Sequence, residues 1–181
     1  MDFELLGWPD EGPTLSLDHR RFPYAGKFVM SNTGKAVARD DESIVGAVSF
    51  NEDRTAEAVM WLRYLSVRQD RQGERIGPRL AATTSAMILE QDYDRVSIAV
   101  NNPFAYQALY RAGFGFTGRT TGLAELVLQT PHTTERSDYE RGLAEFCQRK
   151  DLSQAEREFL AHKDGDPPPE PVSKFEIDHF T

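Results

Sequence analysis

Residues 67–77 of the chain read VRQDRQGERIG, and this stretch decides how the rest of the sequence is interpreted. It follows the strongest strand pattern, residues 59–67, and it leads into a helical pattern that begins at Ile76. A glycine loop between a strand and a helix points several backbone N–H groups one way, where the helix dipole adds positive potential. Arginines within the loop add charge that suits phosphate. The stretch therefore predicts a binding site for an anion.

The chain as a whole is acidic, which makes a basic loop unusual. Its 181 residues carry a formal net charge of −8, and 39% of them are hydrophobic. This composition is typical of a soluble globular protein, and the negative charge argues against general nucleic-acid binding. No apolar run is long enough to span a membrane, and the N-terminus lacks a signal-peptide pattern. The single Cys147 cannot form an internal disulfide, which agrees with the cytoplasmic location that we expect.

Short strands are predicted upstream of the loop. Residues 27–31 and 35–39 flank Asn32-Thr33-Gly34, a sequence that favours a hairpin turn. Residues 1–26 are rich in glycine, proline and charge and are expected to be mostly irregular after one brief strand. The remaining strands are expected at residues 3–6, 44–50 and 59–67.

A helix, a strand and a second helix are predicted downstream. The first helix has a stripe that is expected to be buried: Ile76, Leu80, Thr84, Met87 and Gln91. Residues 95–100 alternate as a strand does. Asn102 and Pro103 then open the second helix as cap and first residue, and Gly113 closes it. Two final strands are expected at residues 114–117 and 123–129.

The last part of the chain is predicted to be a helical extension. Ser137 and Ser153 each precede a glutamate by three residues, which is the capping-box pattern of a helix start. Residues 166–171 form a proline-rich tail. We therefore divide the chain into a domain of residues 1–130 and an extension of residues 131–181, whose helices pack on the core or form a homodimer.

The loop resembles the acetyl-CoA-binding motif of the GNAT acyltransferases. That motif follows a hydrophobic strand and reads Q/R-x-x-G-x-G/A before a helix. Gln72 matches its first position, Ile76 its fifth and Gly77 its last. The fourth position, usually glycine, is Arg75, and a Cβ there limits close approach to phosphate unless the backbone stays right-handed.

A second signature supports the same resemblance. Asn102-x-x-Ala105 and Gly113-Phe114 match it at the spacing that the family uses. The resemblance covers residues 44–129, with weaker support upstream.

The resemblance implies an α/β (α+β) fold: a mixed, mostly antiparallel twisted sheet flanked by helices. In it, the parallel strands of residues 59–67 and 95–100 splay apart and admit acetyl-CoA. Pantetheine would pair with the backbone near Leu65 and Val67, and Asn102 would lie near it unless it serves only as the helix cap. The pyrophosphate would bind the amides of Gln72, Gly73, Glu74, Arg75, Ile76 and Gly77. The arginines would meet the 3′-phosphate or remain solvated surface side chains.

The resemblance also implies a general acid. Many family members carry a tyrosine that protonates the leaving thiolate, and Leu109 occupies that position here. Tyr110 lies about 100° around the helix and Tyr106 lies on nearly the same face as Leu109, so either could replace it. The alternative is that both tyrosines are packing residues.

The general base is less visible in the sequence. Residues 59–67 contain no carboxylate, and Glu125 is the one acid in the late apolar strand, so it is the candidate unless it lies at an exposed edge or ordered water serves instead. Direct transfer needs no covalent intermediate, which favours a core position for Cys147. The four histidines lack ligand spacing, so no metal is predicted.

These observations predict an acetyl-CoA-dependent N-acetyltransferase in which an amine attacks the bound thioester directly. The acceptor is an amine-bearing small molecule or a protein, and the acidic surface favours a cationic one. The competing hypothesis is an acyl-CoA-binding sensor or interaction module with little turnover, because Arg75 and Leu109 depart from the family pattern.

Overall fold

The structure is a computed structural model that describes residues 1–172. The described residues divide into two compact units, Met1–Val96 and Ser97–Val172. They hold seven strands and four α-helices, and the predicted mixed α/β fold class is confirmed. The splayed strand pair would involve both units, so it stays a prediction, as does the domain boundary at residue 130.

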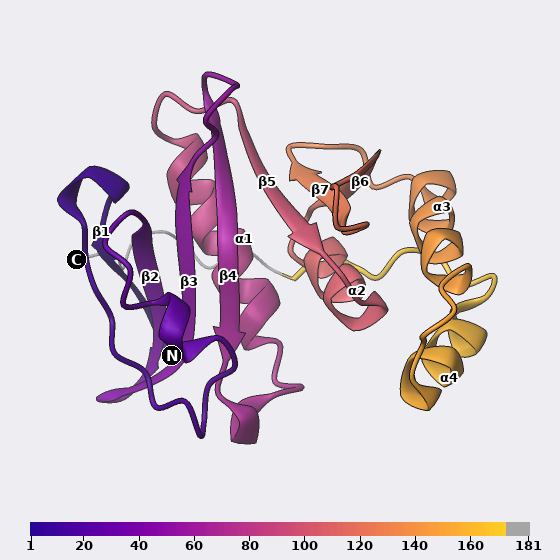
Figure 1. Cartoon of the computed structure of the whole chain (residues 1–181), viewed down its shortest axis with the longest axis horizontal. Coiled ribbons are helices and arrows are strands. Elements are labelled where there is room, and N and C mark those ends of the chain that lie inside the picture. Colours follow the sequence, from indigo (N-terminus) through magenta and orange to yellow (C-terminus); the bar gives the residue numbers. More distant parts are fainter. Residues whose placement is uncertain (173–181) are drawn as a thin grey trace. The chain divides into compact units, whose positions relative to one another are not determined.

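Four strands of the first unit form an antiparallel sheet in chain order, as Figure 1 shows. They are β1 (Asp2–Gly7), β2 (Gly34–Asp40), β3 (Ser43–Glu52) and β4 (Val59–Val67). The strands predicted at residues 3–6, 35–39, 44–50 and 59–67 are thereby confirmed.

Helix α1 (Ile76–Leu89) packs on one face of this sheet, against β2, β3 and β4. Gly46 of β3 permits the close approach, because a Cβ there would lie 3.0 Å from Ile76 Cγ2. Most of the predicted stripe is buried. Gln91 is the exception: the helix ends at Leu89, and Gln91 is exposed.

The opposite face of the sheet is covered by the segment between β1 and β2. Val37 and Ala47 lie there in a buried cluster with Phe28, and Leu15 and Leu17 pack against it. This segment contains only two short 3-10 helices, η1 (Pro9–Glu11) and η2 (Ala25–Lys27), so its predicted irregular character is confirmed.

The hairpin predicted around Asn32-Thr33-Gly34 is wrong in its first half, because residues 27–31 form no strand. Within this segment, the carbonyl of Met30 accepts from Lys35, which is fully buried in β2. Its Nζ donates to the carbonyls of Pro13 (2.5 Å), Met30 (2.7 Å) and Thr33 (3.0 Å). A buried ammonium needs hydrogen-bond acceptors, and the Met30 carbonyl that serves it is not free to pair with a neighbouring strand.

Strand β4 contains a bulge at Arg63. Ser49 pairs with Tyr64 and Phe50 pairs with Leu62, which leaves Arg63 opposite no residue of β3. Neighbouring side chains of a regular strand point to opposite faces, and an inserted residue changes that alternation. The bulge lets Arg63 and Tyr64 line the same pocket.

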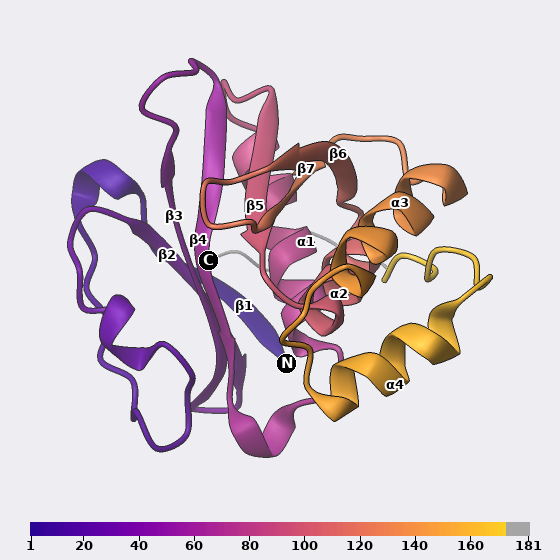
Figure 2. The same cartoon turned by 45° about the vertical axis from the view of Figure 1, so that its right-hand side comes forward.

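The second unit combines a strand pair with three helices, which Figure 2 shows in rose to yellow. After β5 (Arg95–Val100) come α2 (Pro103–Arg111), β6 (Gly115–Thr120), β7 (Leu126–Thr130), α3 (Arg136–Cys147) and α4 (Gln154–Lys163). β6 and β7 pair antiparallel. Helix α3 packs on β6, and α4 contacts α2 and α3.

The structure corrects two expectations for the C-terminal helices. Helix α3 begins at Arg136 with Glu135 as its N-cap, so Ser137 lies inside the helix and makes no capping box. The box at Ser153 is confirmed: its side chain accepts from Glu156 N, and the Glu156 carboxylate accepts from Ser153 N. Cys147 is exposed and not part of the core, because it is the last residue of α3.

No helix in residues 1–172 is long and apolar enough to cross a membrane. His179 and the rest of the tail beyond Val172 lie outside the described residues.

Candidate functional site

The loop after β4 reaches α1 through two left-handed residues. It begins with a short 3-10 helix, η3 (Gln69–Arg71), and then extends at Gln72. Gly73 has φ +87° and Arg75 has φ +60°. Arg75 is the N-cap of α1, and its side chain makes no capping hydrogen bond.

The backbone amides of this loop are available to a ligand. Within residues 1–172, the N–H groups of residues 72–77 have no hydrogen-bond partner. Pro78 carries no N–H, so it removes one donor that would otherwise need a partner at the first turn. Unpaired amides at the positive end of a 14-residue helix form a candidate anion site, and their predicted role in binding the pyrophosphate of CoA stays a prediction.

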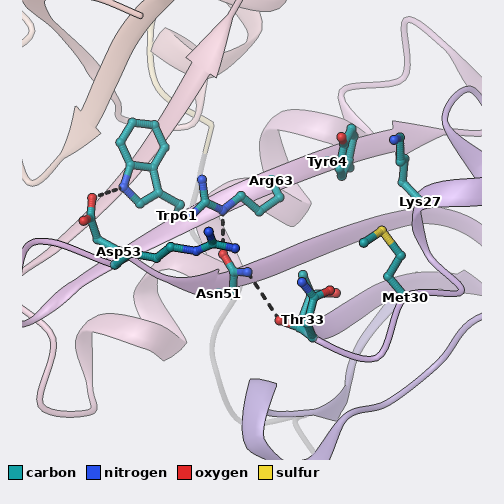
Figure 3. A pocket seen from close by; sticks show the side chains of 10 residues that line it. Lys27, Met30, Thr33, Asn51, Asp53, Trp61, Arg63 and Tyr64 are labelled. Atoms are coloured by element: carbon teal, nitrogen blue, oxygen red, sulfur yellow. Dashed lines mark hydrogen bonds between the residues drawn. The ribbon is translucent and has the colours of Figure 1, made fainter.

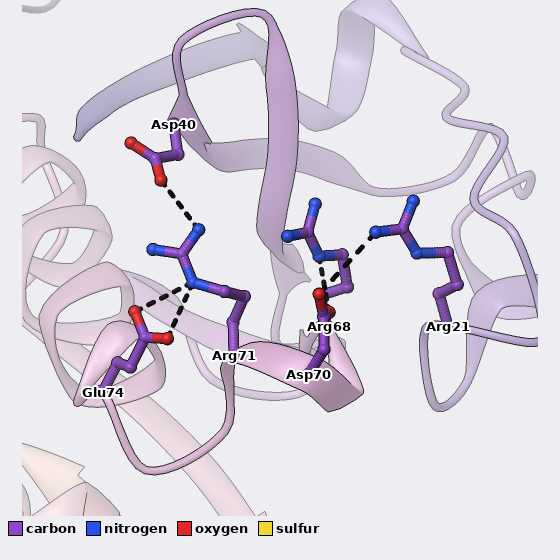
Figure 4. Close-up of polar contacts among 6 residues, drawn as sticks. All are labelled: Arg21, Asp40, Arg68, Asp70, Arg71 and Glu74. Carbon is purple, nitrogen blue, oxygen red and sulfur yellow. Dashed lines mark hydrogen bonds and ion pairs between the residues drawn. The ribbon is translucent and has the colours of Figure 1, made fainter.

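Two arginines of the loop form ion pairs with carboxylates, as Figure 4 shows. Arg71 donates from Nη1 to Asp40 Oδ2 (2.7 Å) and from Nε to both oxygens of Glu74 (2.8 and 2.9 Å). Arg68 Nε donates to Asp70 Oδ1 (2.7 Å). Arg68 and Arg71 therefore brace the loop against neighbouring carboxylates. These ion pairs were not predicted from the sequence, and a contact of the arginines with the 3′-phosphate stays a prediction.

The same contacts fix the charge state of the loop. Hydrogen bonds from Arg71 lower the pKa of Asp40 and of Glu74, and a hydrogen bond from Arg68 lowers the pKa of Asp70. All three carboxylates therefore stay ionised at neutral pH. Arg71 offsets the negative charge that Glu74 would otherwise bring to an anion site.

Comparison with known proteins agrees with this geometry. The acetyltransferase (GNAT) family matches residues 2–116. The chain belongs to the GNAT family. The match includes β4, the whole loop and α1, the elements that carry the candidate site.

Several solved structures are similar in fold. A candidate GNAT acetyltransferase of Desulfovibrio desulfuricans has 14% identity and a TM-score of 0.48, over 54% of this chain and 68% of that one. An N-acetyltransferase of Staphylococcus aureus has 13% identity and a TM-score of 0.47, over 54% and 66%. The PaiA N-acetyltransferase of Thermoplasma acidophilum, in complex with coenzyme A, has 14% identity and a TM-score of 0.46, over 54% and 60%. Among curated proteins, none matches.

Arg75 occupies the position at which GNAT proteins usually have glycine, and its backbone is left-handed. A right-handed backbone was expected to tolerate a Cβ at this position. Arg75 instead has φ +60° and ψ +22°, so that expectation does not apply. A left-handed conformation costs an L-residue about 1–2 kcal/mol. The loop keeps the geometry of a glycine and bears strain at this one residue.

Arg75→Gly is expected to stabilise the protein by roughly 1 kcal/mol, because glycine adopts this conformation without strain. Urea denaturation of wild type and variant measures the difference. Arg79→Gly, inside α1, is the matched control and should destabilise by about 1 kcal/mol. An Arg75→Gly variant that is no more stable than the wild type would show that the strain is absent.

Leu65 and Val67 lie at the end of β4 and pair with Val48 and Gly46 of β3. Their side chains face α1, because a Cβ on Gly77 would lie 3.4 Å from Val67 Cγ2 and 3.8 Å from Leu65 Cδ2. Their predicted role, to pair with pantetheine through the backbone, stays a prediction.

Both candidate tyrosines are fully buried in an aromatic cluster of the second unit. Tyr106 Oη donates to the carbonyls of Tyr139 (3.1 Å) and Asp138 (3.3 Å), and Tyr110 Oη accepts from Phe116 N (2.9 Å). Gly142 of α3 makes room for Tyr106, since a Cβ there would lie 2.1 Å from its Oη. These contacts support the packing alternative, and the acid role stays an untested prediction.

Tyr106→Phe is expected to lower the free energy of unfolding by about 1 kcal/mol through loss of the contact with α3. The pH profile of turnover should keep its shape, because burial raises the pKa of Tyr106 and its hydroxyl already has partners. Tyr110→Phe is the parallel variant. Loss of the alkaline limb from the pH profile of Tyr106→Phe or of Tyr110→Phe would support an acid role for that tyrosine.

Asn102 and Glu125 both have structural roles in the second unit. Asn102 Oδ1 accepts from Ala105 N (2.8 Å), so the predicted cap is confirmed, while its role near pantetheine stays a prediction.

Glu125 was expected within a strand but precedes β7, in a turn closed by a hydrogen bond from Thr121 N to the Glu125 carbonyl (2.8 Å). Its carboxylate accepts from Thr121 Oγ1 (3.2 Å), and its proposed role as base is untested.

Sequence reasoning missed a pocket in the first unit, shown in Figure 3. Its volume is about 510 Å³, and it is lined by Lys27, Met30, Asn32, Thr33, Asn51, Asp53, Arg54, Trp61, Arg63 and Tyr64. The signal in the sequence was Arg63, a single charge inside the longest apolar strand pattern. The other lining residues come from distant segments and have no common motif.

Proposed function

We propose that this GNAT protein is an acetyl-CoA-dependent N-acetyltransferase that works by direct attack of an amine in a ternary complex. The observation that carries the proposal is the row of unpartnered amides at residues 72–77, between β4 and α1. Hydrogen bonds from such amides to a phosphate are charge-assisted and are among the stronger ones in proteins.

In this proposal the loop holds the diphosphate and β4 directs the acyl arm along the sheet. The neutral amine attacks the thioester carbonyl carbon, a C–N bond forms, and the C–S bond breaks. The amine releases a proton to water, and the departing thiolate takes one up. The pocket beside Arg63 receives the acceptor, because it adjoins β4 beyond Leu65.

Asp53 is the carboxylate in that pocket, but it is a poor candidate for the base. Hydrogen bonds from Thr55 N and Trp61 Nε1 hold the pKa of Asp53 at about 2. A general base works best when its pKa lies near the working pH. We therefore assign deprotonation of the amine to water.

Calorimetric titration with CoA and acetyl-CoA, at low and high salt, tests the cofactor part of the proposal. Thiol release from acetyl-CoA, measured with a panel of amines, tests the transfer. We expect saturable binding that weakens with salt, because phosphate contacts are screened, and thiol release that depends on an amine. Absence of binding at both salt concentrations would refute the proposal.

The competing hypothesis is an acyl-CoA sensor. One observation favours it: both tyrosine hydroxyls that could serve as the acid are buried and hydrogen-bonded. A sensor would bind acetyl-CoA in the calorimeter and release no thiol with any amine.

A further inference from the structure

The pocket beside β4 has a charge opposite in sign to that of the chain. Of its lining residues, three are cationic and one is anionic: Lys27, Arg54, Arg63 and Asp53. The chain as a whole carries a formal charge of −8. A cationic pocket in an acidic protein attracts anions locally, so it favours a ligand that carries a negative charge.

Asp53 makes no ion pair with these cations, because its oxygens accept hydrogen bonds from neutral donors; its charge persists and leaves the pocket with an excess of two positive charges. Its Oδ2 accepts from Trp61 Nε1 (2.6 Å), and its Oδ1 accepts from Thr55 N (2.7 Å), Thr55 Oγ1 (2.9 Å) and Ala56 N (3.0 Å). Asp53 thus closes the turn between β3 and β4 and holds the indole in place.

The guanidinium of Arg63 is held in place by neutral groups and has no ion-pair partner within residues 1–172. Its Nε donates to Asn51 Oδ1 (2.5 Å), and its Cζ lies 5.4 Å from the centre of the Trp61 ring. Lys27 is placed in a similar way, with Nζ 5.6 Å from the centre of the Tyr64 ring. Within residues 1–172, neither cation nor Arg54 belongs to an ion pair.

A cation held by an aromatic face and a neutral amide keeps its capacity for an anion. Both Nη groups of Arg63 have no partner in the described chain, and a guanidinium edge matches a carboxylate in shape. The pocket volume of about 510 Å³ is in the range of sites for small molecules. Trp61, Tyr64 and Met30 supply apolar surface beside the cations.

We propose that the acceptor is a small amine that also carries a carboxylate, an amino-acid-like molecule whose carboxylate binds Arg63. The proposal rests on the function proposed above. It replaces the expectation of a cationic acceptor, which came from the net charge of the whole chain.

The position of Arg63 on β4 agrees with this role. Arg63 precedes Val67, the last residue of β4 before the loop, by four residues, which corresponds to about 13 Å along a strand. An acyl arm that runs from the loop past Val67 and Leu65 would therefore approach the bulge. A carboxylate bound to Arg63 would hold the amine of the same molecule near the bulge, which the acyl arm would approach.

The experiment compares matched acceptors in the thiol-release assay. Glycine, β-alanine, 4-aminobutyrate and phenylalanine are each paired with the corresponding amide, which keeps the amine and removes the negative charge. We expect kcat/KM to be about tenfold to a hundredfold higher for at least one acid than for its amide. Equal or higher kcat/KM for every amide would overturn the proposal.

Arg63→Gln supplies the matched variant, because glutamine keeps a polar side chain without the charge. We expect it to raise KM for the preferred acid about tenfold to a hundredfold, to leave KM for the amide nearly unchanged, and to leave acetyl-CoA affinity intact. Arg119→Gln, at an exposed arginine of β6, is the control and should change none of these values. An acid-to-amide ratio that survives Arg63→Gln would overturn the assignment.

A binding measurement separates failure of this inference from failure of the proposed function. The N-acetyl derivative of each acid is titrated into wild type and Arg63→Gln by ligand-observed NMR. Binding that needs Arg63 supports the anion pocket even if no amine is turned over. Turnover of neutral amines, with no Arg63-dependent binding, refutes the pocket and leaves the acetyltransferase proposal standing.

Discussion

Gly77→Glu is expected to reduce the affinity for CoA by about a hundredfold or more. Gly77 is buried at the start of α1, and its amide belongs to the unpartnered row. A carboxylate there repels the diphosphate and competes for the same N–H groups. Hydrogen bonds to charged groups contribute about 1.5–3 kcal/mol each, and about 1.4 kcal/mol corresponds to a factor of ten in affinity. Calorimetry with CoA measures the loss.

Two further variants identify the cause of such a loss. Gly77→Ala should fold and lose less than the glutamate variant, because its Cβ would make ordinary contacts at 3.4 Å with Val67 and 3.8 Å with Leu65. Gly122→Glu places the same charge at an open glycine of the second unit and should leave affinity unchanged. CoA binding by Gly77→Glu at wild-type strength would remove the loop from the site.

Lys35→Met is expected to destabilise the protein by about 3 kcal/mol. Lys35 is fully buried, and the variant would leave the carbonyls of Pro13, Met30 and Thr33 without their donor. Each buried acceptor left without a partner costs about 1–3 kcal/mol, and partial rehydration of the segment keeps the sum near the lower value. Urea denaturation measures the change, with Lys150→Met at an exposed lysine as the control.

The effect of Lys35 should also depend on pH. Burial lowers the pKa of Lys35 from its ordinary value of 10.5, so the unfolded state binds the proton more tightly than the folded state. Stability then rises with pH in the window just below 10.5, where the unfolded lysine still holds its proton. The stability difference between wild type and Lys35→Met should therefore widen across that window. A constant difference would show that the ammonium is not desolvated.

The same lysine connects stability to the proposed acceptor site. Met30 and Thr33 line the pocket, and their carbonyls are held by Lys35 Nζ. Loss of that anchor frees one wall of the pocket, so Lys35→Met should also raise KM for the acceptor.

Sequence reasoning succeeded where the determinants are local. The strand at residues 59–67 and the helix start at Ile76 followed from neighbouring residues, as did the Asn102 cap. Each depends on backbone preferences and hydrogen bonds within a few positions, which a sequence displays directly. The anion loop was predicted for the same reason, since its amides follow from the order of strand, glycine and helix.

Interactions between distant residues required the tertiary structure. The ion pair of Arg71 with Asp40, 31 positions away, was not predicted from the sequence, and a phosphate contact of Arg71 stays a prediction. The partners that α3 supplies to the Tyr106 hydroxyl were likewise not visible in the sequence, and its acid role stays a prediction.

By itself, the sequence determined the family, the order of most elements and the loop that is proposed to hold the diphosphate. The tertiary structure alone decided which charges are already paired and which remain available. Arg63 makes no ion pair within residues 1–172, because it lies over Trp61 and beside Asn51, and the nearby Asp53 carboxylate is hydrogen-bonded within its own turn and to Trp61. Pairing between side chains depends on their separation in space, and that separation is fixed only when the sheet forms.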